Sequence, residues 1–258
     1  MCYADSARPP LPPGTAQPTR SEELALTAAD GNQFAAYLAL PVGQPSAQLL
    51  ILPDVRGLHQ FYKELALRFA EVGIATIALD YFGRTAGIGA RDESFEFWPH
   101  VQQVTLAGFF ADAAASLAHL TAQLERPLPA FSVGFCMGGA LSFHCGTQDL
   151  GLAGVIGFYA GLSRNTAGGP TMLEQASAIK VPALGLFGGD DPGIPADQIA
   201  AFDAALDVAA VSHEVITYPG APHSFFDRRA TDFAADSDDA WQRVLGFIRA
   251  QSPTETLA

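Results

Sequence analysis

A cysteine flanked by glycines constrains the fold of this chain more than any other feature. Residues 134–139 read G-F-C-M-G-G; they end an apolar run that begins at 129, and a potentially helical run follows at 140–144. A sharp turn between a strand and a helix strains its central residue, and glycines on either side let the two elements approach. At a helix N-terminus the unpaired N–H groups favour a thiolate. The pattern predicts a nucleophile elbow centred on Cys136, with a buried structural cysteine as the alternative.

Length, charge and cysteine content restrict the class of protein. The 258 residues, 49% of them hydrophobic, suit one α/β domain with a single core. A formal net charge of −13 argues against nucleic acid as a partner, because phosphate binding requires a basic surface. Three irregularly spaced cysteines indicate a reducing cytoplasm, and no metal-ligand spacing is present. Asp112 and His119 interrupt the longest apolar helix and argue against a membrane span.

The first 21 residues are expected to form a proline-rich arm outside the main domain. Residues 8–14 read R-P-P-L-P-P-G, a proline density that favours an extended conformation, either lying on the surface or mobile. The segment lacks the charged start and apolar core of a signal peptide. We interpret Cys2 as incidental, with a reactive thiol as the alternative. Residues 22–258 are expected to form one domain, because no repeat or linker interrupts them.

The remaining pattern predicts a mostly parallel sheet with helices on both faces. Asp30-Gly31 is a hairpin signal between two strands, and later strands such as 48–52 are continuous apolar runs, typical of parallel strands buried on both faces. The expected strands cover 23–28, 34–40, 48–52, 74–79, 154–158, 183–187 and 214–218, and the expected helices 60–72, 101–124, 196–206 and 236–250.

Two loops after these strands supply partners for the cysteine. Strand 183–187 is followed by Asp190 and Asp191, and strand 214–218 by His223. An α/β-hydrolase sheet presents nucleophile, acid and histidine in this chain order, at the carboxyl ends of its strands. The histidine would take the thiol proton, and a carboxylate would hold the imidazole in the required tautomer. We therefore predict a catalytic triad; solvated loop residues are the alternative.

These motifs resemble those of the dienelactone hydrolases, also called carboxymethylenebutenolidases. Residues 134–139 resemble the family's cysteine elbow, 191–195 (D-P-G-I-P) its D-x-x-I/V-P acid loop, and 223–225 (H-S-F) its histidine loop. The resemblance covers about residues 22–248 and implies an α/β-hydrolase fold with antiparallel N-terminal strands. The acid-loop spacing selects Asp191 over Asp190. Together the motifs are specific for the family and less specific for a substrate.

The loop at residues 52–57 (L-P-D-V-R-G) resembles the family's loop after its third strand. The resemblance implies that the backbone amides of Val55 and Met137 face the developing oxyanion. It also implies that Asp54 belongs to the substrate site, where the family commonly has a longer glutamate. A helix-capping role is the alternative for this aspartate.

Arginines are implied as ligands of a substrate carboxylate. Residues 80–84 (D-Y-F-G-R) resemble the family segment D-L/Y-x-x-R, which gives this role to Arg84; a surface position is the alternative. The family usually has a further arginine just after the histidine loop. Here Arg228 and Arg229 follow, displaced by about one residue; we assign the role to Arg228, with Arg229 as the alternative.

The sequence thus predicts a cysteine-dependent hydrolase that opens small carboxylated lactones through a thioester, without a cofactor. The resemblance suggests conversion of dienelactone to maleylacetate in the degradation of chlorinated aromatics. A general carboxylesterase, a non-catalytic binding protein and a thiol redox sensor are the alternatives. The complete triad argues against a non-catalytic protein, and the absence of a nearby resolving cysteine argues against a sensor. The oligomeric state is left open.

Overall fold

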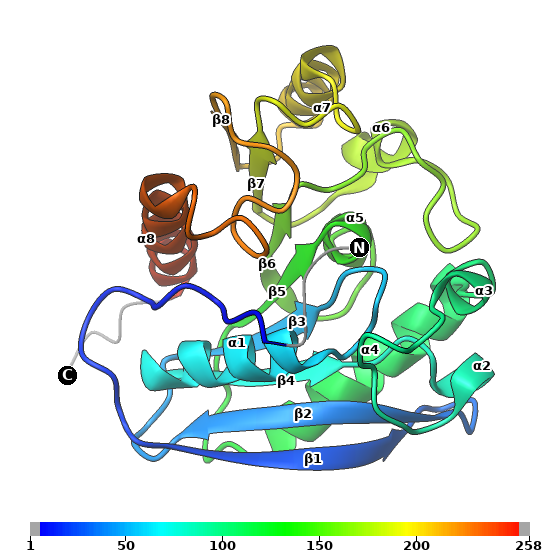
Figure 1. The fold of residues 1–258 in the computed structure, drawn as a ribbon, viewed down its shortest axis with the longest axis vertical. Coiled ribbons are helices and arrows are strands. Elements are labelled where there is room, and N and C mark those ends of the chain that lie inside the picture. The colour runs from blue at the N-terminus through cyan, green and yellow to red at the C-terminus, as the bar shows by residue number, and fades with distance from the viewer. Residues whose placement is uncertain (1–5, 253–258) are drawn as a thin grey trace.

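Eight strands form one sheet in residues 6–252, which the computed structural model describes (Figure 1). In chain order they are β1 (Thr19–Thr27), β2 (Gln33–Pro41), β3 (Ala47–Leu52), β4 (Ile74–Leu79), β5 (Ala130–Phe135), β6 (Leu152–Phe158), β7 (Ala183–Gly188) and β8 (His213–Tyr218). Their order across the sheet is β1-β2-β4-β3-β5-β6-β7-β8. The β1–β2 and β2–β4 pairs are antiparallel, and all later pairs are parallel. The predicted fold class is confirmed.

Helices cover both faces of the sheet (Figure 1). On one face α1 (Gln60–Glu71) and α8 (Ala234–Ala250) meet, with the rings of Phe69 and Trp241 4.6 Å apart. The other face carries α4 (Leu106–Ala122), α5 (Met137–Cys145) and α7 (Ala196–Val208). Short turns of helix complete the chain at α2 (Gly83–Ala86), α3 (Trp98–Val101), α6 (Met172–Gln175) and the 3₁₀ turn Ala176–Ala178.

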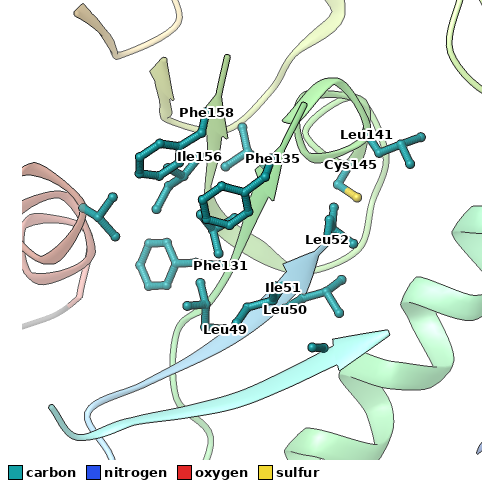
Figure 2. Close-up of a cluster of buried hydrophobic side chains, with 14 of the residues drawn as sticks. Leu49, Leu50, Ile51, Leu52, Phe131, Phe135, Leu141, Cys145, Ile156 and Phe158 are labelled. Carbon is teal, nitrogen blue, oxygen red and sulfur yellow. The ribbon is translucent and has the colours of Figure 1, made fainter. Parts of the chain in front are cut away.

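The central strands supply the core between these helix layers (Figure 2). All six residues of β3 are buried, as are all six of β4, because both faces of these strands are covered. From β5, Phe135 stacks on Phe158 of β6 with ring centroids 4.8 Å apart. Each such fully buried aromatic or aliphatic side chain contributes about 1.5–3 kcal/mol. This packed core adjoins the ends of β3 and β5. At this point of the sheet the strand order reverses, because β4 lies on one side of β3 and β5 on the other.

One predicted helix is interrupted. The expected helix at 101–124 is in fact the end of α3 and the separate helix α4. Thr105 lies between them in an extended conformation, with φ of −123° and ψ of 147°, and its side chain accepts a hydrogen bond from Gly108 N. A threonine that caps a new helix ends the preceding one, although the apolar pattern runs on.

The proline-rich arm packs against the domain where the structure describes it. Pro9 is buried, and Trp241 donates its indole N–H to Pro10 O at 3.1 Å. Further along, Gln17 N donates to Glu71 O at 2.9 Å. The arm therefore runs along α8 and α1, and its last residues, 19–21, already belong to β1. Cys2 lies outside the described residues.

Candidate active site

Cys136 occupies the sharp turn between β5 and α5. Its φ of 56° and ψ of −113° lie outside the regions that non-glycine residues favour, and strain of this kind is found at nucleophile elbows. A Cβ atom on Gly134 would lie 1.8 Å from Gly138 O, and one on Gly138 would lie 2.1 Å from Leu52 O. The glycines are therefore required for the strand, the helix and the neighbouring β3 to meet at this point.

The loops after β7 and β8 bring an acid and a histidine together. Asp191 Oδ2 lies 2.6 Å from His223 Nδ1, and Asp191 Oδ1 accepts a hydrogen bond from Gly193 N at 2.8 Å. The Asp191 side chain is buried, whereas neighbouring Asp190 is exposed. Asp191 is thus the carboxylate that holds the imidazole, with its second oxygen fixed by the loop backbone.

The electrostatics of His223 favour a protonated ring. Burial alone would lower its pKa, but hydrogen bonds to Asp191 and Cys136, together with their charges, raise it to about 10. An imidazole with such a pKa keeps both protons at neutral pH. The ring of His223 is therefore expected to carry a positive charge next to Cys136.

A tyrosine and a second aspartate lie against the other side of the histidine. The ring of Tyr159, directly after β6, lies 4.9 Å from the His223 ring, and its hydroxyl donates to Asp227 Oδ2 at 2.8 Å. Asp227 also accepts a hydrogen bond from Arg228 N. Tyr159 has a φ of 36°, a left-handed value that is uncommon for a bulky residue. The sequence reasoning missed both residues, although Tyr159 follows a predicted strand end, as the three predicted triad residues do.

A cavity of about 540 Å³ is lined by Cys136, Asp191 and His223. Its wall also contains apolar side chains and the segment that follows β6. The lining residues are Val55, Trp98, Val101, Gln102, Cys136, Met137, Gly161, Arg164, Asn165, Thr166, Ala167, Gly168, Asp191, Gly193, Ile194 and His223. Val55 and Met137, the residues expected to supply the oxyanion amides, are thus both present beside the thiol. Within the described chain neither of their N–H groups donates to another protein group.

Comparison with known proteins assigns the family. The model of the dienelactone hydrolase family matches residues 34–252. The chain belongs to this family. It is 30% identical to "Putative carboxymethylenebutenolidase" of Synechocystis sp., over 85% of this chain and 92% of that protein. A protein of the same name from Saccharolobus solfataricus is 28% identical, over 86% of this chain and 96% of its own length. The resemblance inferred from the sequence is confirmed.

A solved structure shows the same fold. The crystal structure titled as a putative dienelactone hydrolase from Klebsiella pneumoniae superposes with a TM-score of 0.80 at 23% identity, over 90% of this chain and 99% of that one. Family membership makes the protein a hydrolase that acts on esters, so the predicted enzyme class is also confirmed. None of the helices in residues 6–252 has the length and apolar character needed to cross a membrane.

In this family member the aspartate at position 54 is buried and is not among the residues that line the cavity. Its side chain is fully buried, Oδ1 accepts a hydrogen bond from Arg56 N at 2.9 Å, and its backbone N–H donates to Tyr62 Oη at 3.0 Å. Asp54 therefore fixes the turn that presents Val55. It does not cap α1, whose N-cap is His59.

The structure does not bring Arg84 or Arg228 to the cavity wall. Arg84 pairs with Asp30 and Asp112 and donates to Gly108 O at 3.0 Å. A Cβ at position 108 would lie 2.6 Å from Arg84 Nε, so the glycine opens the path that the side chain takes along α4. Two carboxylates thus hold Arg84 away from the site. Arg228 is exposed and absent from the lining residues.

The neighbouring arginines have carboxylate partners as well. Arg229 pairs with Asp232 at 2.7 Å. Arg91 pairs with Asp80 at 2.9 Å, and both of these side chains are buried. Among the described residues that line the cavity, Arg164 is the only arginine or lysine. No motif in the sequence distinguished it from other loop arginines.

A group of metal-ligating residue types lies away from the cavity. Asp203 and Asp207 of α7 and His213 of β8 have side-chain atoms within 4.8 Å of one another, and none of them lines the cavity. His213 Nδ1 lies 2.6 Å from Val211 O, and its Nε2 lies 3.1 Å from Asp203. Contacts of the imidazole with Val211 O and with the Asp203 carboxylate account for this arrangement.

Proposed function

We propose that this protein is a cysteine-dependent hydrolase that opens small carboxylated lactones through a thioester intermediate. The observation that carries the proposal is the hydrogen-bonded pair of Asp191 and His223, which shares one cavity with Cys136 in its strained turn. The family's relatives named carboxymethylenebutenolidases support this substrate class. Conversion of dienelactone to maleylacetate is the reaction we propose to test first.

The reaction begins with the thiolate of Cys136. Its sulfur attacks the carbonyl carbon, and the carbonyl oxygen takes the negative charge while the N–H groups of Val55 and Met137 donate to it. When the intermediate collapses, the ring C–O bond breaks, and the imidazolium of His223 gives its proton to the departing oxygen. The product at this stage is a thioester with the opened chain still attached.

Water completes the cycle. The imidazole of His223, now neutral, takes a proton from a water molecule as that water attacks the thioester carbonyl. The C–S bond then breaks, the acid is released, and the thiolate–imidazolium pair is restored. Asp191 keeps the ring oriented through both halves of the reaction and stabilises its positive charge.

The cavity favours a second candidate within the enzyme class, a general carboxylesterase. Its volume of about 540 Å³ lies in the range of roughly 300–1,000 Å³ that holds drug-sized ligands. A small lactone would fill only part of this space. A panel of carboxylated lactones and neutral aryl esters, assayed with the purified protein, separates the two functions by the ratio of kcat/KM values.

Substitution of the cysteines tests the proposed chemistry itself. Cys136→Ala should abolish turnover, and iodoacetamide should inactivate the protein with one label at Cys136. Cys145→Ser is the matched control, because Cys145 is fully buried in α5 and burial raises its pKa. Cys2→Ser should likewise retain activity. Turnover by Cys136→Ala would overturn the proposal.

A further inference from the structure

Arg164 stands at the wall of the catalytic cavity. It belongs to the segment 161–168, which follows β6 and lines the cavity together with Cys136 and His223. A Cβ built on Gly193 would lie 3.6 Å from Arg164 Nη2 and 3.2 Å from Asp191 Oδ1. The guanidinium therefore sits beside the acid loop that holds the catalytic histidine.

The charge of this arginine is not neutralised by the described protein. Its side chain is exposed, and no carboxylate of residues 6–252 lies within ion-pair distance of it. The contrast with Arg84 and Arg91 is clear, because each of these is held by aspartates. In a chain of net charge −13, a cation that has no carboxylate partner and lines the same cavity as Cys136 is available to an anionic ligand.

The chemistry of the side chain indicates which anion. A guanidinium presents parallel N–H donors that match the two oxygens of a carboxylate. The exposed acidic groups of the protein would weaken the attraction at long range, but at physiological salt their fields decay over about 8 Å. A direct contact at the cavity wall is much less screened. A carboxylate that enters the cavity can therefore bind Arg164 despite the overall negative charge.

The rest of the wall offers apolar surface that an apolar group of the same ligand can contact. Trp98 is 57% exposed at the cavity, and Val101, Ile194 and Met137 add further apolar surface. Apolar walls with a few placed polar groups are typical of sites for ligands larger than a single small ring. The cavity thus combines one cationic contact with room for an apolar substituent.

We propose that Arg164 is the carboxylate-binding residue of the substrate site, and that the preferred substrates are esters or lactones carrying one carboxylate and an apolar group larger than the lactone ring. The inference rests on the proposed function, since it concerns the substrate of the same cysteine. It differs from the family resemblance in placing anion recognition on the segment after β6 and not on Arg84 or Arg228.

The test compares two aryl esters of matched shape. The 4-nitrophenyl monoester of glutaric acid carries a carboxylate at the end of its acyl chain, and 4-nitrophenyl pentanoate has a methyl group there. We expect the unmodified enzyme to prefer the anionic ester. Arg164→Gln should lower kcat/KM for the anionic ester by about tenfold to a hundredfold, as expected for the loss of a charge-assisted contact. Its kcat/KM for the neutral ester should stay within about twofold.

Two further variants distinguish the contact from general charge effects. Arg164→Lys should retain part of the anionic preference, because it keeps the charge and loses the planar fork. Arg249→Gln makes the same change of charge on an exposed residue of α8 and should leave both substrates unchanged. An equal effect of Arg249→Gln on the anionic ester would show that the preference reflects net charge, which would overturn the inference.

The size requirement is measured separately. A carboxylated lactone that carries an apolar ring substituent should have a higher kcat/KM than the same lactone without that substituent, and Trp98→Ala should reduce this advantage. A higher value for the small lactone would overturn the size requirement. Equal losses on the anionic and neutral esters in Arg164→Gln would overturn the carboxylate contact. Neither result would affect the proposed chemistry, which fails only if Cys136→Ala retains turnover.

Discussion

Replacing Asp227 with asparagine should change how stability depends on pH. The carboxyl group of Asp227 is 4% exposed and accepts the hydroxyl hydrogen bond of Tyr159. Burial and the nearby charge of Asp54 raise its pKa from 3.8 to about 7, even though the hydrogen bond from the Arg228 amide opposes the shift. The buried carboxylate is therefore destabilised relative to its neutral form.

The direction of the change in unfolding free energy with pH follows from the proton that Asp227 binds. Between about pH 4 and pH 7 the folded protein keeps the Asp227 proton and the unfolded chain has lost it, so the unfolding free energy falls as pH rises through this window. At about 1.36 kcal/mol per pH unit, the full window corresponds to roughly 4 kcal/mol as an upper bound. Above about pH 7 both states are ionised at this position and the contribution becomes constant.

Urea unfolding at half-unit steps from pH 4.5 to 8.5 measures the effect. Asp227→Asn removes the ionisation, so the difference in unfolding free energy between variant and unmodified protein should rise with pH up to about 7 and then level off. A lost hydrogen bond would add only a constant offset of about 1 kcal/mol. Asp190→Asn, in an exposed loop, is the control for the loss of an acidic side chain. A difference for Asp227→Asn that does not vary with pH would refute the reasoning.

Other substitutions test the remaining parts of the site and fold. Asp191→Asn should lower kcat by roughly 10³–10⁴-fold, because the amide does not hold His223 in the required tautomer. Asp190→Asn should retain most activity. The opposite ranking would assign the carboxylate of the predicted triad to Asp190. Hydrogen bonds to Asp191 and Cys136 outweigh burial and raise the pKa of His223 to about 10. The imidazole NMR signals should therefore titrate near pH 10 in the unmodified protein and nearer pH 6.5 in Asp191→Asn. A midpoint near pH 6.5 in the unmodified protein would contradict the pairing of His223 with Asp191. Arg84→Gln should lower the unfolding free energy by about 1–3 kcal/mol through loss of its partly buried ion pair with Asp112. Any change in kcat/KM should be the same for anionic and neutral esters. A selective loss of kcat/KM for the anionic ester would support a substrate-binding role for Arg84.

The fold and the arrangement of the triad could be predicted from short-range patterns. Apolar runs such as β3 identify strands buried on both faces, and the glycines around Cys136 identify a turn that no larger residue permits. These signals are readable because an apolar run and a glycine pattern each lie within a short stretch of the chain, even where the groups packed against them are distant in sequence. The order of Cys136, Asp191 and His223 then placed three chemical groups at the carboxyl ends of β5, β7 and β8. The structure brings Asp191 and His223 together as that order predicts, while the roles of all three stay predictions.

Only the tertiary structure decided which arginine faces the cavity. Arg84 follows a motif that implies substrate binding, but Asp30 and Asp112, distant from it in sequence, hold its side chain elsewhere. Arg164 follows no motif, and its position depends on how the segment after β6 packs beside the acid loop. The direction of a long charged side chain is set by the carboxylates that surround it in space. No spacing within the chain determines those partners, so the sequence predicts a cysteine nucleophile, whereas the folded structure decides which arginine lines the cavity.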